Sequence, residues 1–346
     1  MTPFSTQIRQ VRARNRNLGE PSTASREQER KARLFRRAAL LAVAALALLV
    51  ALVAAPGSAS AATLGTSGSE LEYRGTPGAS DSVFLRYRRN RDFYTVASFS
   101  IGHIARRAPC FGGPDPDKGE FASQNPIAGC PASGLQIADI ELGDRNDELN
   151  IGLDEDFGSD EGSFEPRRPL KINADGGSGR DQIEGGPLAD RLFGASGNDN
   201  LFGSGGSDLI RGGSGNDFIR GSGLIKGGGR DKISGDSGRD QIEGLAGSDR
   251  ISAGTGNDFV NGGGRFSRGD RADRISGGAG NDKLVDYQSG KETTGDRFSG
   301  GPGNDKINDR DGNRDYIDCG RGRDDAYVDR KDKVARNCER VRRPGK

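Results

Sequence analysis

A nine-residue period runs through the second half of the chain and limits what it can fold into. In every copy an Asp stands two residues before an apolar residue. The copies repeat at a spacing of nine residues, interrupted by three inserts of five or six residues and by a slip of one residue before Asp315. The recurring residues are Asp181, Asp190, Asp199, Asp208, Asp217, Asp231, Asp240, Asp249, Asp258, Asp273, Asp282, Asp296, Asp305, Asp315 and Asp324. Such regularity indicates a repeat architecture in which each unit packs mainly on its neighbours.

Each nonapeptide divides into a glycine-rich turn and a short strand. In the copy "GGSGNDFIR", residues 212–220, the apolar residue two positions after the Asp has neighbours that are mostly polar across the other copies. This out-in-out alternation is typical of a strand with one buried position. Two nonapeptides then form a coil of 18 residues, and residue i stacks on residue i+18. The sequence therefore predicts an all-β fold built from 18-residue coils.

The repeated Asp raises an electrostatic problem that a cation solves. Stacked strands lie about 4.8 Å apart, so neighbouring carboxylates repel by roughly 1 kcal/mol in water and about 3 to 4 kcal/mol at an effective dielectric of 20. Ca²⁺ accepts six to eight hard oxygen ligands, and glycine turns let backbone carbonyls approach an ion. Because the repeats contain no His and almost no Cys, soft-ligand metals are disfavoured. The alternative is a metal-free solenoid whose Asp side chains only cap turns.

The repeat resembles the RTX, or hemolysin-type, calcium-binding nonapeptide G-G-x-G-x-D-x-U-x. The resemblance covers about residues 176–327, and the copies that begin at residues 176, 212, 277 and 300 match every motif position. It implies a parallel β-roll, a Ca²⁺-binding β-solenoid, with several Ca²⁺ ions between successive turns. The implied metal ligands are Asp181, Asp190, Asp199, Asp208, Asp217, Asp231, Asp240, Asp249, Asp258, Asp282 and Asp305.

Four copies lack the fourth-position glycine of the motif and carry Leu188, Arg271, Thr294 or Asn313 there. Leu, Arg and Thr tolerate a positive φ poorly, so we expect weaker sites beside these residues. The best-preserved stacked pairs are Asp181 with Asp199, Asp199 with Asp217, Asp231 with Asp249, and Asp240 with Asp258.

Residues 1–61 read as a basic n-region and a signal peptide. The apolar run 38–55 follows Arg36 and Arg37, and Ala59–Ala61 fits a small-residue cleavage site. The alternative is an uncleaved anchor, because 18 apolar residues approach the length of a membrane span. Either interpretation predicts a secreted or cell-surface protein, with no membrane contact unless residues 38–55 remain as the anchor.

Four further segments follow: a β-rich N-terminal cap at 62–151, an acidic loop at 152–169, the nonapeptide roll at 170–309, and C-terminal repeats with a cap at 310–346. Cys110 with Cys130 and Cys319 with Cys338 form two local pairs, which predict one disulfide in each cap of an exported chain. Zinc binding is the alternative, but neither pair has C-x-x-C spacing, and His103 is the chain's single histidine.

The sequence favours binding over catalysis. One histidine excludes the H-E-x-x-H metalloprotease motif, and no phosphate-binding G-x-x-x-x-G-K-[ST] motif occurs. The chain beyond residue 61 is mildly acidic, which argues against nucleic-acid binding. We predict a calcium-binding protein with a structural or adhesive role towards an unidentified cell-surface or extracellular-matrix partner. The alternative is a carbohydrate-active enzyme on a β-helix that uses Asp154, Asp156 or Asp160, although a thin roll leaves little room for a cleft.

Overall fold

The computed structural model describes residues 63–67, 69–75, 77–88, 93–98, 105–106, 111–112, 127–131, 135–152, 169–222, 228–263, 272–286 and 295–344. Every helix or strand assigned in these ranges is a β-strand, which confirms the all-β prediction. The described ranges hold no helix that is long and apolar enough to cross a membrane. The predicted signal segment, most of the acidic loop with Asp154, Asp156 and Asp160, and Cys110 lie outside the described residues.

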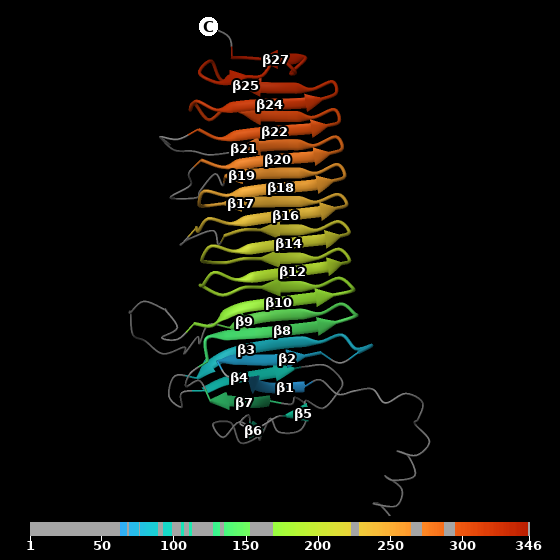
Figure 1. Ribbon diagram of the computed structural model, residues 1–346, viewed down its shortest axis with the longest axis vertical. Helices are drawn as coiled ribbons and strands as arrows, with labels where there is room; N and C mark the ends of the chain where they lie inside the picture. Colours follow the sequence, from blue (N-terminus) through green and yellow to red (C-terminus); the bar gives the residue numbers. More distant parts are fainter. Residues whose placement is uncertain are drawn as a thin grey trace, which may run out of the picture. The chain divides into compact units, whose positions relative to one another are not determined.

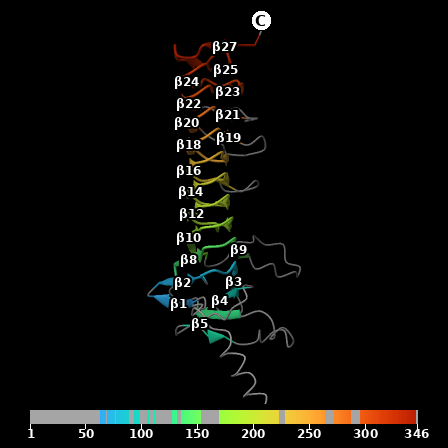
Figure 2. The ribbon, with the colours of Figure 1, turned by 90° about the vertical axis from the view of Figure 1, so that its right-hand side faces the viewer.

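The strands of residues 59–346 form two sheets that face each other and are stacked strand upon strand (Figures 1 and 2). The 13-stranded sheet runs in the order β26 (Lys333–Val334), β24 (Tyr316–Arg321), β22 (Arg297–Pro302), β20 (Arg274–Ala279), β18 (Arg250–Thr255), β16 (Lys232–Ser237), β14 (Leu209–Ser214), β12 (Arg191–Ser196), β10 (Lys171–Gly177), β8 (Ile137–Gly143), β2 (Glu70–Arg74), β1 (Thr63–Ser67) and β5 (Ala105–Arg106).

The 14-stranded sheet runs in the order β27 (Arg340–Arg342), β25 (Asp325–Val328), β23 (Lys306–Asp309), β21 (Lys283–Asp286), β19 (Phe259–Gly263), β17 (Gln241–Leu245), β15 (Phe218–Arg220), β13 (Asn200–Phe202), β11 (Gln182–Glu184), β9 (Glu148–Gly152), β3 (Ser82–Arg88), β4 (Phe93–Ser98), β7 (Ile127–Pro131) and β6 (Phe111–Gly112). From β8 onward the chain alternates between the two sheets.

The register confirms the 18-residue coil. Leu192 pairs with Ile210 in one sheet, and Leu201 pairs with Ile219 in the other, all in parallel strands. Across an insert the sequence separation grows to 23 or 24, yet the apolar positions still pair with one another, as Ile219 does with Ile242. The three inserts all connect the 14-stranded sheet to the 13-stranded sheet, so they lengthen turns without shifting the strands.

The apolar residue of each repeat points inward and forms the core. These side chains are at most 2% exposed, and burial of each contributes roughly 1.5 to 3 kcal/mol. Their inward columns consist of Leu192, Ile210, Ile233, Ile251, Ile275, Phe298 and Ile317 in one sheet, and of Ile183, Leu201, Ile219, Ile242, Val260, Leu284, Ile307 and Ala326 in the other.

Both ends of the roll are covered. At the N-terminal end, β2 and β3 continue the parallel stack, while β1 and β4 pair with them antiparallel and stop it. At the C-terminal end, Cys319 of β24 forms a disulfide with Cys338, with the Cα atoms 5.1 Å apart. The β-roll, its β N-terminal cap and its stapled C-terminal cap are thus confirmed. The Cys110–Cys130 pair lies outside the residues whose side chains are described and stays a prediction.

Candidate metal centres at the two edges of the roll

The turns divide into two sets, and each set forms one long edge of the roll. We call the turns that lead from the 13-stranded to the 14-stranded sheet the regular edge. They hold Asp181, Asp199, Asp217, Asp240, Asp258, Asp282, Asp305 and Asp324. The turns that lead back form the irregular edge, with Asp190, Asp208, Asp231, Asp249, Asp273, Asp296, Asp315 and Asp332. Seven of the predicted ligands therefore lie on the regular edge and four on the irregular edge.

The aspartates of the regular edge form an unbroken buried ladder. The backbone N–H of each Asp donates a hydrogen bond to Oδ1 of the Asp one coil further on, for example from Asp181 to Asp199 at 2.8 Å and from Asp199 to Asp217 at 2.9 Å. The ladder residues from Asp181 to Asp324 are at most 3% exposed. The same hydrogen bond links all four of the best-preserved stacked pairs that the sequence predicted. Three of these pairs lie on the regular edge, and the fourth, Asp231 with Asp249, lies on the irregular edge.

The ladder extends beyond the residues that the sequence identified as ligands. Asp147 lies below Asp181 and accepts the N–H of Asp81, and Glu339 at the other end accepts the N–H of Asp324. The segment around Asp147 was recognisable as a degenerate repeat. Asp81 follows Gly75 and Gly78 and stands two residues before the buried Val83, so it carries a degenerate repeat signal that the nine-residue count did not include. Glu339 has no glycine turn before it, and no motif signal marked it.

The second carboxylate oxygen of this ladder is buried and unbonded. Among the described residues no hydrogen-bond donor reaches Oδ2 of Asp147, Asp181, Asp199, Asp217, Asp240, Asp258, Asp282, Asp305 or Asp324. A backbone carbonyl faces the same space: a Cβ placed on Gly176 would lie 2.5 Å from Asp181 Oδ2 and 3.0 Å from the Gly194 carbonyl oxygen. Buried polar atoms are rarely left unpaired, and converging hard oxygens are what Ca²⁺ binds.

The fourth-position glycines of the regular edge are required by close stacking. Gly197 and Gly215 have φ values of 143° and 132°, a region that side chains rarely adopt. A Cβ on Gly197 would also overlap the Gly179 carbonyl oxygen. The same arrangement recurs in every regular-edge turn from Gly179 to Gly322, so the backbone carbonyls approach the next coil where only glycine fits.

The irregular edge departs from this pattern. Leu188 and Asn313 lie in its turns, and Arg271, Thr294 and the three inserts belong to the sequence between strands on this side, largely outside the described residues. Fourth-position glycines occur only in its middle, at Gly206, Gly229 and Gly247. Two of its carboxylates are satisfied by the protein itself: Asp190 Oδ2 accepts the N–H of Gly186 at 2.7 Å, and Asp231 Oδ2 accepts the Ser222 hydroxyl at 3.0 Å. At these two positions the Asp caps a turn, whereas Asp208 and Asp315 on the same edge keep a buried Oδ2 that no donor among the described residues reaches.

Burial makes the ladder carboxylates weak acids in the metal-free chain. Removal from water raises the pKa of Asp181 and of Asp240 to about 7, against opposing hydrogen bonds from the backbone. On the irregular edge burial raises the pKa of Asp208 to about 8. Neighbouring ladder carboxylates add to each of these shifts.

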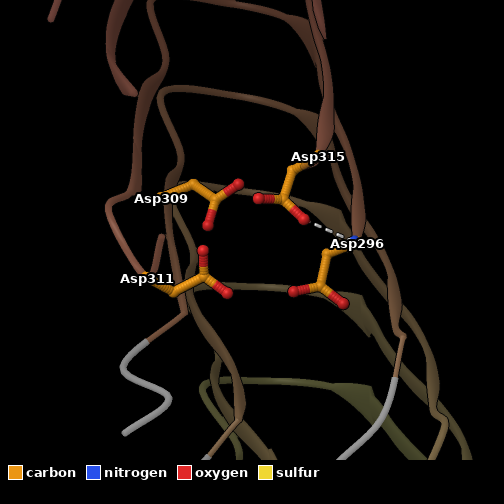
Figure 3. A group of neighbouring side chains, drawn as sticks. All are labelled: Asp296, Asp309, Asp311 and Asp315. Carbon is orange, nitrogen blue, oxygen red and sulfur yellow. Dashed lines mark hydrogen bonds between the residues drawn. The ribbon is translucent and has the colours of Figure 1, made fainter. Parts of the chain in front are cut away.

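Near the C-terminal end, the irregular edge contains a group of four Asp side chains. One carboxylate oxygen from each of Asp296, Asp309, Asp311 and Asp315 lies within 4.8 Å of the others, and Figure 3 shows the four side chains pointing toward one another. Oδ1 of Asp315 accepts the backbone N–H of Asp296 at 2.7 Å. Burial, followed by the charges of Asp315, Asp311 and Asp296, raises the pKa of Asp309 to about 11.

Comparison with known proteins identifies repeats that contribute turns to both the regular and the irregular edge. The family model of the RTX calcium-binding nonapeptide repeat matches four segments, residues 174–199, 184–219, 227–260 and 268–285. Searches of curated proteins and of solved structures return no significant match. Residues 174–285 thus carry RTX calcium-binding nonapeptide repeats, which confirms the resemblance seen in the sequence.

Proposed function

We propose that this chain is a secreted or cell-surface calcium-binding protein whose roll folds when Ca²⁺ ions fill the regular edge. One observation carries the proposal. In coil after coil, a buried Asp Oδ2 without a hydrogen-bond donor faces a backbone carbonyl oxygen, within repeats of a calcium-binding family. The seven predicted ligands from Asp181 to Asp305 on this edge are the residues that we assign to Ca²⁺.

Ion binding removes two unfavourable terms at once. Stacked ladder carboxylates repel by about 3 to 4 kcal/mol per neighbour at an effective dielectric of 20, and an unsatisfied buried oxygen costs about 1 to 3 kcal/mol. Each ladder Asp also contacts two neighbouring coils, as Asp199 does. An ion bound between two coils therefore orders both of them, so filling of the edge is cooperative with folding.

The test is a Ca²⁺ titration of the full chain followed by far-UV circular dichroism. We expect little β signal in chelator and a steep rise as Ca²⁺ reaches about 0.1 to 1 mM, the range of many extracellular sites. Mg²⁺ at the same concentration should be far less effective, because it demands shorter bonds and near-octahedral geometry. A full β spectrum in chelator, unchanged by Ca²⁺, would contradict the proposal.

Export is the second part of the proposal. The apolar run 38–55 with its cleavage site supports it. The Cys319–Cys338 disulfide supports it as well, because disulfides persist in oxidising compartments. N-terminal sequencing of the protein recovered from the producing cells distinguishes the two forms. A mature chain starting near residue 62 indicates secretion, and an intact N-terminus in the membrane fraction indicates an anchor. An intact chain in the cytosol contradicts export.

A structural or adhesive role, without catalysis, completes the proposal. An adhesive role is favoured by a column of exposed cations: Lys232, Arg250, Arg274 and Arg297 pair in register on adjacent parallel strands. They line a groove of about 620 Å³. Cations repeated at the strand spacing of about 4.8 Å suit an anionic polymer. We expect the Ca²⁺-loaded chain to bind dextran sulfate and not neutral dextran, and R250Q/R274Q to weaken this binding. Equal binding of both polymers would contradict the adhesive role.

The enzymatic alternative has a direct test. The chain is incubated in Ca²⁺ with a panel of acidic polysaccharides, and new reducing ends are measured. We expect no turnover. Turnover that is lost in D154A, and retained in a matched D318N variant, would replace the binding function with a catalytic one.

A further inference from the structure

The irregular edge gains carboxylates where it has lost its motif glycines. In the turns nearer the N-terminal end, the residue two positions after the inward apolar residue of the 14-stranded sheet is a glycine, such as Gly221, Gly244 and Gly262. Because Asn261 pairs with Val285, and Asp286 pairs with Asp309, Gly262, Asp286 and Asp309 occupy one column. The two turns that contain Asp296 and Asp315 therefore replace this glycine by Asp, and the last turn carries Val328 in the same column.

This column is directed at the ladder of the irregular edge. A Cβ on Gly262 would lie 3.0 Å from Asp273 Oδ2 and 3.1 Å from Asp286 Oδ2. A carboxylate placed in the same column one or two coils further on is consequently brought against the ladder aspartates. Two groups of carboxylates result, Asp273 with Asp286 and Asp296, and Asp296 with Asp309, Asp311 and Asp315.

The second group contains a side chain that points to a missing ligand. Asp309 is 0% exposed, no hydrogen-bond donor from outside the group reaches either of its carboxylate oxygens among the described residues, and its carboxyl group points at the other three and lies against that of Asp315 (Figure 3). A buried charge persists only when it is paired or when it coordinates a metal. Asp311 is only partly buried, which leaves the group a route to solvent.

We propose that Asp296, Asp309, Asp311 and Asp315 form a Ca²⁺ site that is built from side-chain carboxylates rather than from turn carbonyls. Four carboxylates offer up to eight hard oxygens, the coordination range of Ca²⁺. Ligand atoms within 4.8 Å of one another fit around an ion with bonds of about 2.3 to 2.6 Å. The absence of nitrogen and sulfur ligands from the group disfavours zinc. The site is independent of the regular edge, because it uses neither its turns nor its aspartates.

Ion counting tests the site separately from the repeat function. Equilibrium dialysis of the full chain against saturating Ca²⁺ gives the bound ions per chain for the wild type, D309N/D311N and D318N. Asp318 lies on the same coil outside the group and serves as the charge-matched control. We expect the double variant to lose about one Ca²⁺ per chain and the control to lose none. An unchanged count in the double variant would overturn the proposal, while the ions that remain bound report on the regular edge.

The thermal midpoint of D309N supplies a second test, because carboxylates that bind Ca²⁺ and carboxylates without a cation predict different changes in it. Asn has nearly the shape of Asp but no charge. If the four carboxylates hold no cation, the substitution removes no ligand, and the midpoint at saturating Ca²⁺ stays unchanged or rises. If they hold Ca²⁺, it removes a ligand and lowers the midpoint, and D318N leaves it nearly unchanged. A midpoint of D309N that is unchanged or raised overturns the proposal.

Discussion

The two edges of the roll are made from the same nonapeptide, yet some of their Asp carboxylates differ in their hydrogen-bond partners. On the regular edge, Oδ2 of Asp199 is buried without a donor beside backbone carbonyls. On the irregular edge, both carboxylate oxygens of Asp190 accept backbone N–H groups, from Ile172 and Gly186. The same residue in the same motif position is therefore an open ligand at Asp199 and a closed turn cap at Asp190, while Asp208 on the irregular edge is open in the same way as Asp199.

At Asp190 the comparison links the closed carboxylate to the missing glycine of its own turn. Fourth-position glycine on the regular edge permits a backbone path in which a carbonyl stacks against the next coil. Where Leu188 stands at this position, φ is not positive, and the turn instead brings the Gly186 N–H to the carboxylate.

The largest expected effect is the difference in stability between two variants that each add one methyl group, one on either edge. G197A should destabilise the Ca²⁺-loaded roll by about 2 to 5 kcal/mol, because alanine is strained at a φ of 143° and its Cβ overlaps the Gly179 carbonyl. G186A should change stability by no more than about 0.5 kcal/mol, because its Cβ would meet no atom closer than 3.6 Å. Urea unfolding at saturating Ca²⁺ measures both. Equal losses would show that the glycines matter for the chain in general and not for one edge.

The next effect separates ligands from caps. D199N should raise the Ca²⁺ midpoint of folding about tenfold or more, because Asp199 faces two neighbouring coils and two sites lose a ligand. D190N should cost about 1 kcal/mol of stability through its lost hydrogen bond from Gly186, with a change in the Ca²⁺ midpoint of less than about threefold. The two midpoints come from parallel titrations followed by circular dichroism. A midpoint that shifts as much in D190N as in D199N would give both edges the same role.

Much of this organisation was predictable from the sequence. The rest depended on which copies lie on which of the two edges. The apolar column at Ile219 and the stacking of Asp199 on Asp217 follow from the period alone. The predicted 18-residue coil already sends alternate copies to opposite edges. Sorting the copies by this alternation, with the inserts taken into account, places Leu188 and Asn313 on the same edge. Asp309 was not predicted as a ligand, because it replaces a glycine that the motif requires.

A smaller effect follows from acid in the absence of calcium. Because burial raises the pKa of Asp181 and Asp240 from 3.8 to about 7, the folded chain binds protons more tightly than the unfolded chain between those values. Protonation therefore stabilises the metal-free fold at low pH, and this stability is lost as the pH rises towards 7. In chelator we expect more β signal at pH 5 than at pH 7.5.

Saturating Ca²⁺ should reverse this dependence on pH, because protons then compete with the ion for the same carboxylates. D181N/D240N removes two of the titrating groups from the regular edge, and it should reduce the gain on acidification in chelator. Thermal melts at both pH values, with and without Ca²⁺, give the four quantities needed. A chelated chain that is more stable at pH 7.5 than at pH 5 would contradict the raised pKa values.

The smallest expected effect tests whether the backbone is equally strained on both edges. Ala195 on the regular edge has a φ of 71°, and Ser204 on the irregular edge has a φ of 72°. Relief of left-handed strain in A195G and S204G is about 1 kcal/mol or more per residue, and the extra freedom of glycine in the unfolded chain removes about 0.5 to 1 kcal/mol of that gain. Both variants should therefore be more stable by up to about 0.5 kcal/mol. The stability gain reports the relief of strain, and it should be similar in both variants. The Ca²⁺ titration reports binding. If Ca²⁺ organises only the regular edge, the Ca²⁺ transition becomes steeper in A195G and stays unchanged in S204G.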